Sequence, residues 1–113
     1  MSTKGRRGRR HYHVYVVELD PAILDRRKFR EVNPAYVAGK DCLYIGMTGL
    51  TPERRFHNHK QGYKANPFVR DYGWSLRPDL YPDGSPFTYR EALALEEEVA
   101  RELRKLGYGV WQH

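Results

Sequence analysis

The apolar residues of the chain fall into runs typical of strands and into spacings typical of helices. Residues 12–19, YHVYVVEL, are aromatic and β-branched, which predicts a strand. Residues 42–47, CLYIGM, form a short apolar run that predicts a second, buried strand. A third strand is expected over 74–80, at an edge of the sheet because Pro78 has no N–H group to donate. Residues 108–111 follow as a short extended segment.

Capping residues mark two well-defined helices. A helix is predicted over 51–61, because its opening threonine is a good N-cap, the proline after it suits the first turn, and Gly62 can end it. A longer helix is predicted from Thr88 to Leu106, because Thr88 and Glu91 have the spacing of a capping box. Its apolar residues form one stripe at helical spacing: Ala92, Leu95, Val99, Leu103 and Leu106.

Two shorter helices are expected in more polar stretches. Asp20 followed by proline is typical of an N-cap and a first turn, so a short exposed helix is predicted over 22–32. Asn33 and Pro34 would end that helix. Another short helix is predicted over 66–72.

Charge and length narrow the class of protein. Lys and Arg total 20 and Asp and Glu total 14, so the net charge is +6, and nucleic acid is the first candidate for an acidic partner. Residues 1–10 carry +5 of this charge and predict a basic flexible arm, for which a solubilising tail is the alternative. The remaining residues, 11–113, predict a single domain, too short for a barrel enzyme, a full dinucleotide-binding enzyme or a kinase.

Cysteine usage and hydropathy bear on the compartment. The single cysteine, Cys42, excludes an internal disulfide and a cysteine-rich zinc site. A reducing, intracellular and cytoplasmic location is therefore expected. No apolar run approaches the roughly 18 residues of a membrane span, so we expect no membrane partner.

A small set of polar residues lies on the apolar elements. Tyr15 and Tyr44 lie in the middle of the two central strands, and Arg55 and His59 are four apart and share one face of a helix. Glu96 is the carboxylate of the long helix that lies nearest its apolar stripe. Taken singly, each has an ordinary structural explanation as core packing, a solvated helix face or a paired acid.

The order of these residues resembles the GIY-YIG nuclease family. His13-Val14-Tyr15 stands where the family has its first tripeptide, and Tyr44-Ile45-Gly46 matches the second one. The family's arginine, with a histidine or tyrosine one turn later, matches Arg55 and His59; the competing register is Arg54 with Asn58. The family's metal-binding glutamate matches Glu96.

The sequence departs from the family pattern at three places. His13 replaces the first glycine of the tripeptide. The 29 positions from Tyr15 to Tyr44 exceed the family's usual hairpin, so residues 20–41 are interpreted as an insertion. The family's late asparagine has no clear match, and Gln112 is the nearest candidate.

The resemblance implies an α/β (α+β) fold, with a small, mainly antiparallel three-stranded central sheet flanked by helices. It implies hydrolysis of phosphodiester bonds in DNA, RNA not being excluded, with one Mg²⁺ or Mn²⁺ ion held by Glu96. Arg55 would neutralise phosphate charge and Tyr15 would handle the proton of the attacking water. His59 would assist Tyr15, and Tyr44 would hydrogen-bond the water or the phosphate.

Residues 51–77 are basic, with a net charge of +4. The nucleic-acid-binding residues predicted in this segment are Arg54, Lys60, Lys64 and Arg70. Two other functions remain open: a non-catalytic nucleic-acid-binding module on the same fold, and a small adaptor protein whose charges are only solvated. A monomer and a homodimer are equally compatible with the sequence.

Overall fold

The two strands predicted from the apolar runs pair with each other at the centre of the sheet. In this computed structural model, which describes residues 9–112, β1 (His13–Leu19) is antiparallel to β2 (Cys42–Thr48). The register sets Tyr15 opposite Gly46 and Val17 opposite Tyr44. Both tyrosines therefore lie on the same face of the sheet, because side chains alternate along a strand.

The sheet has four strands and is mixed, so the predicted three-stranded sheet is wrong in detail although the α+β class is confirmed. The strand order is β3-β1-β2-β4. β3 (Gly73–Leu76) is antiparallel to β1, and it is shorter than predicted because η2 (Pro78–Leu80) turns the chain away. β4 (Gly109–Gln112) is parallel to β2. A parallel strand needs a long crossover, and α5 (Tyr89–Lys105) supplies it.

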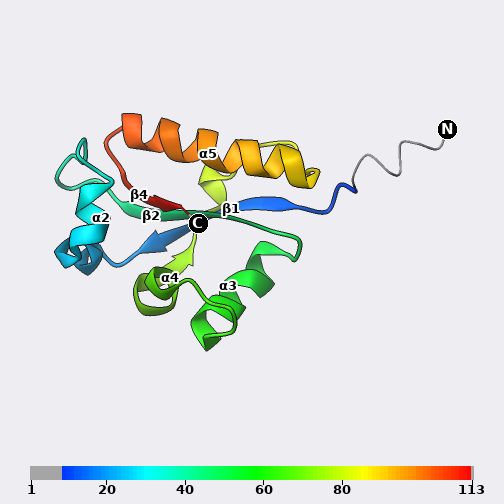
Figure 1. Ribbon diagram of the computed structural model, residues 1–113, viewed down its shortest axis with the longest axis horizontal. Helices are drawn as coiled ribbons and strands as arrows, with labels where there is room; N and C mark the ends of the chain where they lie inside the picture. Colours follow the sequence, from blue (N-terminus) through cyan, green and yellow to red (C-terminus); the bar gives the residue numbers. More distant parts are fainter. Residues whose placement is uncertain (1–8, 113) are drawn as a thin grey trace.

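Helices cover both faces of the sheet (Figure 1). α5 packs on one face, over a core that includes Val14, Val16, Leu43 and Ile45. α3 (Pro52–Gln61) and α4 (Pro67–Tyr72) cover the other face, which carries Tyr15, Val17 and Tyr44. None of the helices in residues 9–112 is long and apolar enough to cross a membrane.

The predicted helix caps are confirmed. The Thr51 hydroxyl accepts a hydrogen bond from the N–H of Arg54 at 3.1 Å, and Gly62 ends α3 in the left-handed conformation, with φ +85°. At the start of α5, Thr88 and Glu91 form the reciprocal capping box. Local chemistry therefore determines where these helices begin and end.

The segment 20–41 forms a separate lobe beside β4. The single helix predicted over 22–32 is instead η1 (Pro21–Asp25) followed by α2 (Arg27–Glu31), because Arg26 between them is extended. Asn33 is buried and fastens the lobe to β4: its Oδ1 accepts from the N–H of Val110 at 2.7 Å and its Nδ2 donates to the Val110 carbonyl at 3.0 Å.

Most of the predicted arm lies outside the described residues. Of residues 1–10, the structure describes only Arg9 and Arg10. Arg10 forms an ion pair with Glu91 near the start of α5, with an N–O distance of 2.9 Å. Arg10 therefore lies beside the first turn of α5.

Candidate active site

Tyr15 and His59 are joined by a hydrogen bond in the interior of the protein. The Tyr15 hydroxyl oxygen lies 2.8 Å from His59 Nε2, and both residues are at most 1 % exposed. β1 directs Tyr15 toward α3, and His59 lies on the face of α3 that packs against the sheet. The sequence predicted both residues as members of one site, and the structure brings them into contact.

A backbone hydrogen bond determines the tautomer of His59. The N–H of Asn66, in the loop after α3, donates to His59 Nδ1 at 3.0 Å. A ring nitrogen that accepts a hydrogen bond carries no proton, so the proton of the neutral imidazole is on Nε2. His59 therefore donates to the Tyr15 oxygen, and the hydroxyl proton of Tyr15 does not point toward His59.

Asn66 is a positioning residue that the sequence analysis did not identify. Its side-chain oxygen caps α4 by accepting the N–H of Phe68 at 2.9 Å, while its own N–H reaches His59. The signal for it was present, since an asparagine before Pro67 is a typical helix start. The contact with His59 could only be seen in the folded chain.

Tyr44 and Gly46 complete the buried centre. The rings of Tyr44 and Tyr15 have centroids 6.1 Å apart, and Tyr44 meets the His59 ring edge to face at 5.7 Å. A Cβ atom at Gly46 would lie 2.8 Å from atoms of both tyrosine rings. The glycine of the Tyr44-Ile45-Gly46 motif therefore leaves the room that the two rings occupy.

Both tyrosines are neutral at neutral pH. Burial raises the pKa of Tyr15 far above its usual value of 10, the nearby Tyr44 hydroxyl adds to the rise, and Arg55 opposes it. Burial raises the pKa of Tyr44 to about 12, against a hydrogen bond with Tyr15 that lowers it, and the charge of Glu96 raises it further. Neither phenol can act as a base until its pKa is lowered.

The Arg55 register of α3, rather than the Arg54 register, faces the tyrosines. Arg55 is half-buried, and its Nη2 donates to the carbonyl of Lys64 at 2.9 Å, which holds the side chain against the turn after α3. Arg54 is exposed and lines a different hollow of about 470 Å³, here called the N-terminal hollow, together with Arg10, His11 and His13.

Glu96 comes from the opposite face of the sheet but reaches the same site. It is only 4 % exposed and lines a hollow of about 300 Å³ with Tyr15, Tyr44 and Arg55; we call this the tyrosine hollow. β4 pairs with β2 only over Cys42–Ile45, and the tyrosine hollow is lined by the residues just beyond, 47–49. The hollow therefore opens beside the end of β4, where α5 passes the sheet.

Glu97 and Gln112 are among the further polar side chains that line the tyrosine hollow. Glu97, which the helical spacing places away from the apolar stripe, is exposed but borders the hollow next to Glu96. Gln112 ends β4 at its rim, and its amide oxygen accepts from Arg104 at 3.5 Å. The sequence analysis noted Gln112 only as the nearest late amide and did not include Glu97 in the site.

The predicted nucleic-acid-binding residues of 51–77 do not line the tyrosine hollow. The Lys60 side chain has a structural role, because its Nζ donates to the carbonyls of Arg70 and Gly73, each at 2.9 Å, and so ties α3 to the end of α4. The Arg70 guanidinium pairs with Asp71, and the Lys64 ammonium lies 5.5 Å from the centre of the Tyr63 ring. Arg54 remains the best placed of the four for a nucleic acid that reaches the site, because Gly49 borders both its hollow and the tyrosine hollow.

The donor atoms at the hollow suit a hydrated divalent cation. Within the described part of the chain, no group of three or more His, Cys, Asp or Glu side chains is arranged to hold a metal. Glu96, Glu97 and Gln112 offer oxygen atoms around one hollow. Mg²⁺ takes oxygen ligands, keeps several waters and is commonly bound by one or two carboxylates plus a phosphate. This chemistry fits Mg²⁺ or Mn²⁺ and does not fit a closed zinc site.

Comparison of the chain with protein-family models, with curated proteins and with solved structures gave no match. The resemblance to the GIY-YIG nucleases therefore rests on the motif residues and on their meeting at one site.

Proposed function

We propose that the protein is an endonuclease of the GIY-YIG type that hydrolyses phosphodiester bonds in DNA with the help of one divalent cation. The observation that carries this proposal is the convergence of residues from four elements, β1, β2, α3 and α5, on the tyrosine hollow. Two neutral phenols, a guanidinium and a carboxylate around one opening can supply the proton transfer, the positive charge and the metal ligand that phosphodiester hydrolysis uses.

In this proposal Tyr15 is the general base. Its hydroxyl proton must first leave to solvent, after which the phenolate takes a proton from the attacking water. The charge of Arg55 favours the phenolate and is among the groups that lower the pKa of Tyr15. The Nε2–H of His59 would also stabilise the phenolate, because a donor favours the charged form of its acceptor. His59 therefore supports the base by donating a hydrogen bond, and it does not itself accept the proton.

The remaining residues act on the phosphate. Arg55 offers a positive fork for charge that develops on a phosphate oxygen, while Tyr44 orients the water or the phosphate through its hydroxyl. Glu96 would hold the divalent cation, with Glu97 and Gln112 beside it. When bound, such a cation polarises the phosphate and assists the leaving oxygen.

The test is nicking of supercoiled plasmid in Mg²⁺, with a single-stranded RNA in parallel. We expect Arg55→Ala and Glu96→Gln to lose at least 100-fold in rate, on the order of what loss of one charge-stabilising group costs. Arg54→Ala is the matched control on the neighbouring position of α3, and it should weaken binding but leave the rate at saturating DNA within about threefold. Metal-dependent cleavage at the wild-type rate in both site variants would refute the assignment.

A second candidate, a nucleic-acid-binding module without cleavage, is favoured by the N-terminal hollow. Its basic side chains (Arg10, His11, His13 and Arg54) would contact phosphates, and His13 replaces the glycine of the family's first tripeptide. Binding that weakens steeply with salt, without turnover in Mg²⁺ or Mn²⁺, would favour this function.

A further inference from the structure

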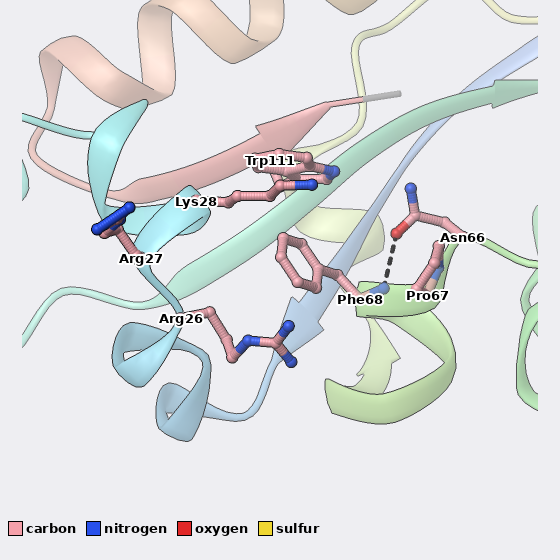
Figure 2. Close-up of a pocket in the computed structure, with 7 residues that line it drawn as sticks. All are labelled: Arg26, Arg27, Lys28, Asn66, Pro67, Phe68 and Trp111. Carbon is pink, nitrogen blue, oxygen red and sulfur yellow. Dashed lines mark hydrogen bonds between the residues drawn. The ribbon is translucent and has the colours of Figure 1, made fainter.

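The lobe formed by 20–41 borders a further hollow, separate from the tyrosine hollow and the N-terminal hollow. Its volume is about 560 Å³, within the size range of small-molecule sites, which is roughly 300–1,000 Å³. Figure 2 shows side chains from three segments around it: Arg26 and Lys28 at α2, Asn66 to Phe68 at the start of α4, and Trp111 on β4, while Arg27 points away from the others. The lining residues are Arg26, Arg27, Lys28, Asn66, Pro67, Phe68 and Trp111. We call it the aromatic–cationic hollow.

One wall of this hollow is aromatic. Trp111 is half-buried and Phe68 is 8 % exposed, and their rings meet edge to face with centroids 4.8 Å apart. The guanidinium of Arg26 lies 5.6 Å from the centre of the Phe68 ring. Phe68 is therefore largely covered, and Trp111 is the ring that keeps surface at the opening, which a planar ligand could cover.

The other wall is positive. Arg26, Arg27 and Lys28 are consecutive and exposed, and none of the lining residues is acidic. Arg27 is paired with Glu31 one turn along α2, at 3.4 Å. The Asp71 carboxylate is held by Arg70, with a hydrogen bond of 2.9 Å. Arg26 and Lys28 are thus the two cations best placed to meet an anion at the hollow.

We propose that the aromatic–cationic hollow binds one unstacked nucleotide. The base lies against the half-buried ring of Trp111, and the phosphate is bound by Arg26 and Lys28. A nucleotide is the ligand class that joins a flat aromatic ring to a compact anion, and aromatic rings beside cations are the usual platform for unpaired bases. The nucleotide can come from an unpaired position in a strand or be a free mononucleotide.

Two contacts link residues that line this hollow to residues of the candidate active site. Trp111 lies opposite Tyr44 in the pairing of β4 with β2, and Asn66, which lines the aromatic–cationic hollow, donates its N–H to His59. A nucleotide held here would lie on the same face of the sheet as Tyr15 and His59. Binding requires no cleavage, so the proposal goes beyond the nuclease function and stands without it.

The test uses the fluorescence of Trp111. The chain has two tryptophans, and Trp74 is 56 % exposed, so Trp74→Phe leaves Trp111 as the only indole. The full-length variant is titrated in EDTA, which excludes turnover, with dAMP, deoxyadenosine, inorganic phosphate, a hairpin with one bulged nucleotide and the same hairpin without the bulge. We expect saturable quenching by dAMP or by the bulged hairpin. Deoxyadenosine and phosphate should bind at least tenfold more weakly than dAMP.

Charge variants decide whether the cations take part. In the Trp74→Phe protein, the double substitution of Arg26→Gln and Lys28→Gln should weaken dAMP binding at least tenfold. Arg101→Gln is the control, because Arg101 is an exposed arginine on α5, and it should leave dAMP binding unchanged. Circular dichroism checks that each variant folds. If the double variant does not fold, the exposed Lys28→Gln alone is used, with a loss of at least threefold expected.

The outcomes separate the two sources and the alternatives. Tighter binding of the bulged hairpin than of the unbulged one assigns the site to an unpaired nucleotide in a strand. Saturation by dAMP, with equal binding of the two hairpins, assigns it to a free nucleotide. Phosphate binding as tightly as dAMP, no saturable quenching, or an affinity unchanged by the charge variants would each overturn the proposal. Loss of plasmid nicking has no bearing on any of these results.

Discussion

Alkaline pH should destabilise the protein through its buried tyrosines. The pKa of Tyr44 is raised by burial from 10 to about 12 in the folded protein. A raised pKa means that the folded state holds its proton more tightly than the unfolded state does. The stability that this contributes is therefore fully present below pH 10 and is lost as the pH rises toward 12.

The magnitude follows from the size of the shift. Each pH unit between the two pKa values costs on the order of 1 kcal/mol, so the shift of Tyr44 is worth about 2–3 kcal/mol, most of which is lost between pH 10 and pH 12. Tyr15, whose pKa is raised further still, adds a similar slope over the same range. This loss is a large share of the roughly 5–15 kcal/mol that stabilises a typical domain.

Urea unfolding at half-unit steps from pH 8 to pH 11.5 measures the slope. Tyr44→Phe removes the titrating group but keeps most of the ring. Above pH 10 the free energy of unfolding of this variant should therefore fall less steeply than that of the wild type, and the two slopes should differ by about 1.4 kcal/mol per pH unit. Tyr63→Phe is the control, because Tyr63 is 60 % exposed, and its slope should match the wild type. Equal slopes for Tyr44→Phe and the wild type would refute the argument that burial holds this phenol neutral.

Two further predictions concern the supports of the site. Gly46→Ala should lower the free energy of unfolding by about 1–3 kcal/mol, because a Cβ would lie 2.8 Å from the Tyr15 ring; urea unfolding measures this, and unchanged stability would contradict the close packing. Asn33→Ala should cost about 1–3 kcal/mol, because it leaves the buried N–H of Val110 without its acceptor, whereas the Val110 carbonyl keeps the hydrogen bond from Arg104. Thermal unfolding would then begin in the 20–41 lobe, and faster amide exchange at Val110 is the readout; protection as in the wild type would contradict this role.

Local signals in the sequence predicted much of the secondary structure. Thr51 with its following proline, Gly62 and the Thr88–Glu91 pair mark helix ends by satisfying backbone groups within a few residues, and the structure confirms them. The strands of residues 12–19 and 42–47 were also predicted close to their observed bounds. These features depend on neighbours in the chain and need no knowledge of the fold.

Other features depend on contacts between distant residues, and the sequence analysis missed or misjudged them. β4 was seen only as an extended segment, since nothing in its sequence states that it pairs in parallel with β2. The helix expected over 22–32 breaks at Arg26. Helical spacing favoured Glu96 and did not point to Glu97, because spacing predicts the packing face of α5 and not which residues border a hollow beside the end of a strand.

For the site, the sequence by itself suggested the residues through their resemblance to the GIY-YIG motifs, and strand alternation and helical spacing predicted which of them share a face of one element. The tertiary structure decided three things that spacing cannot: that Glu96 lines the same hollow as Tyr44 although α5 packs on the opposite face, that Arg55 and not Arg54 faces the tyrosines, and that His59 donates to Tyr15. Each depends on a contact across elements, namely the short pairing of β4, the turn that holds Arg55, and the N–H of Asn66 on His59. Neighbouring residues in the chain determine local geometry, so the sequence predicts it directly. Burial, charge and proton position at a site depend on groups that only folding brings together.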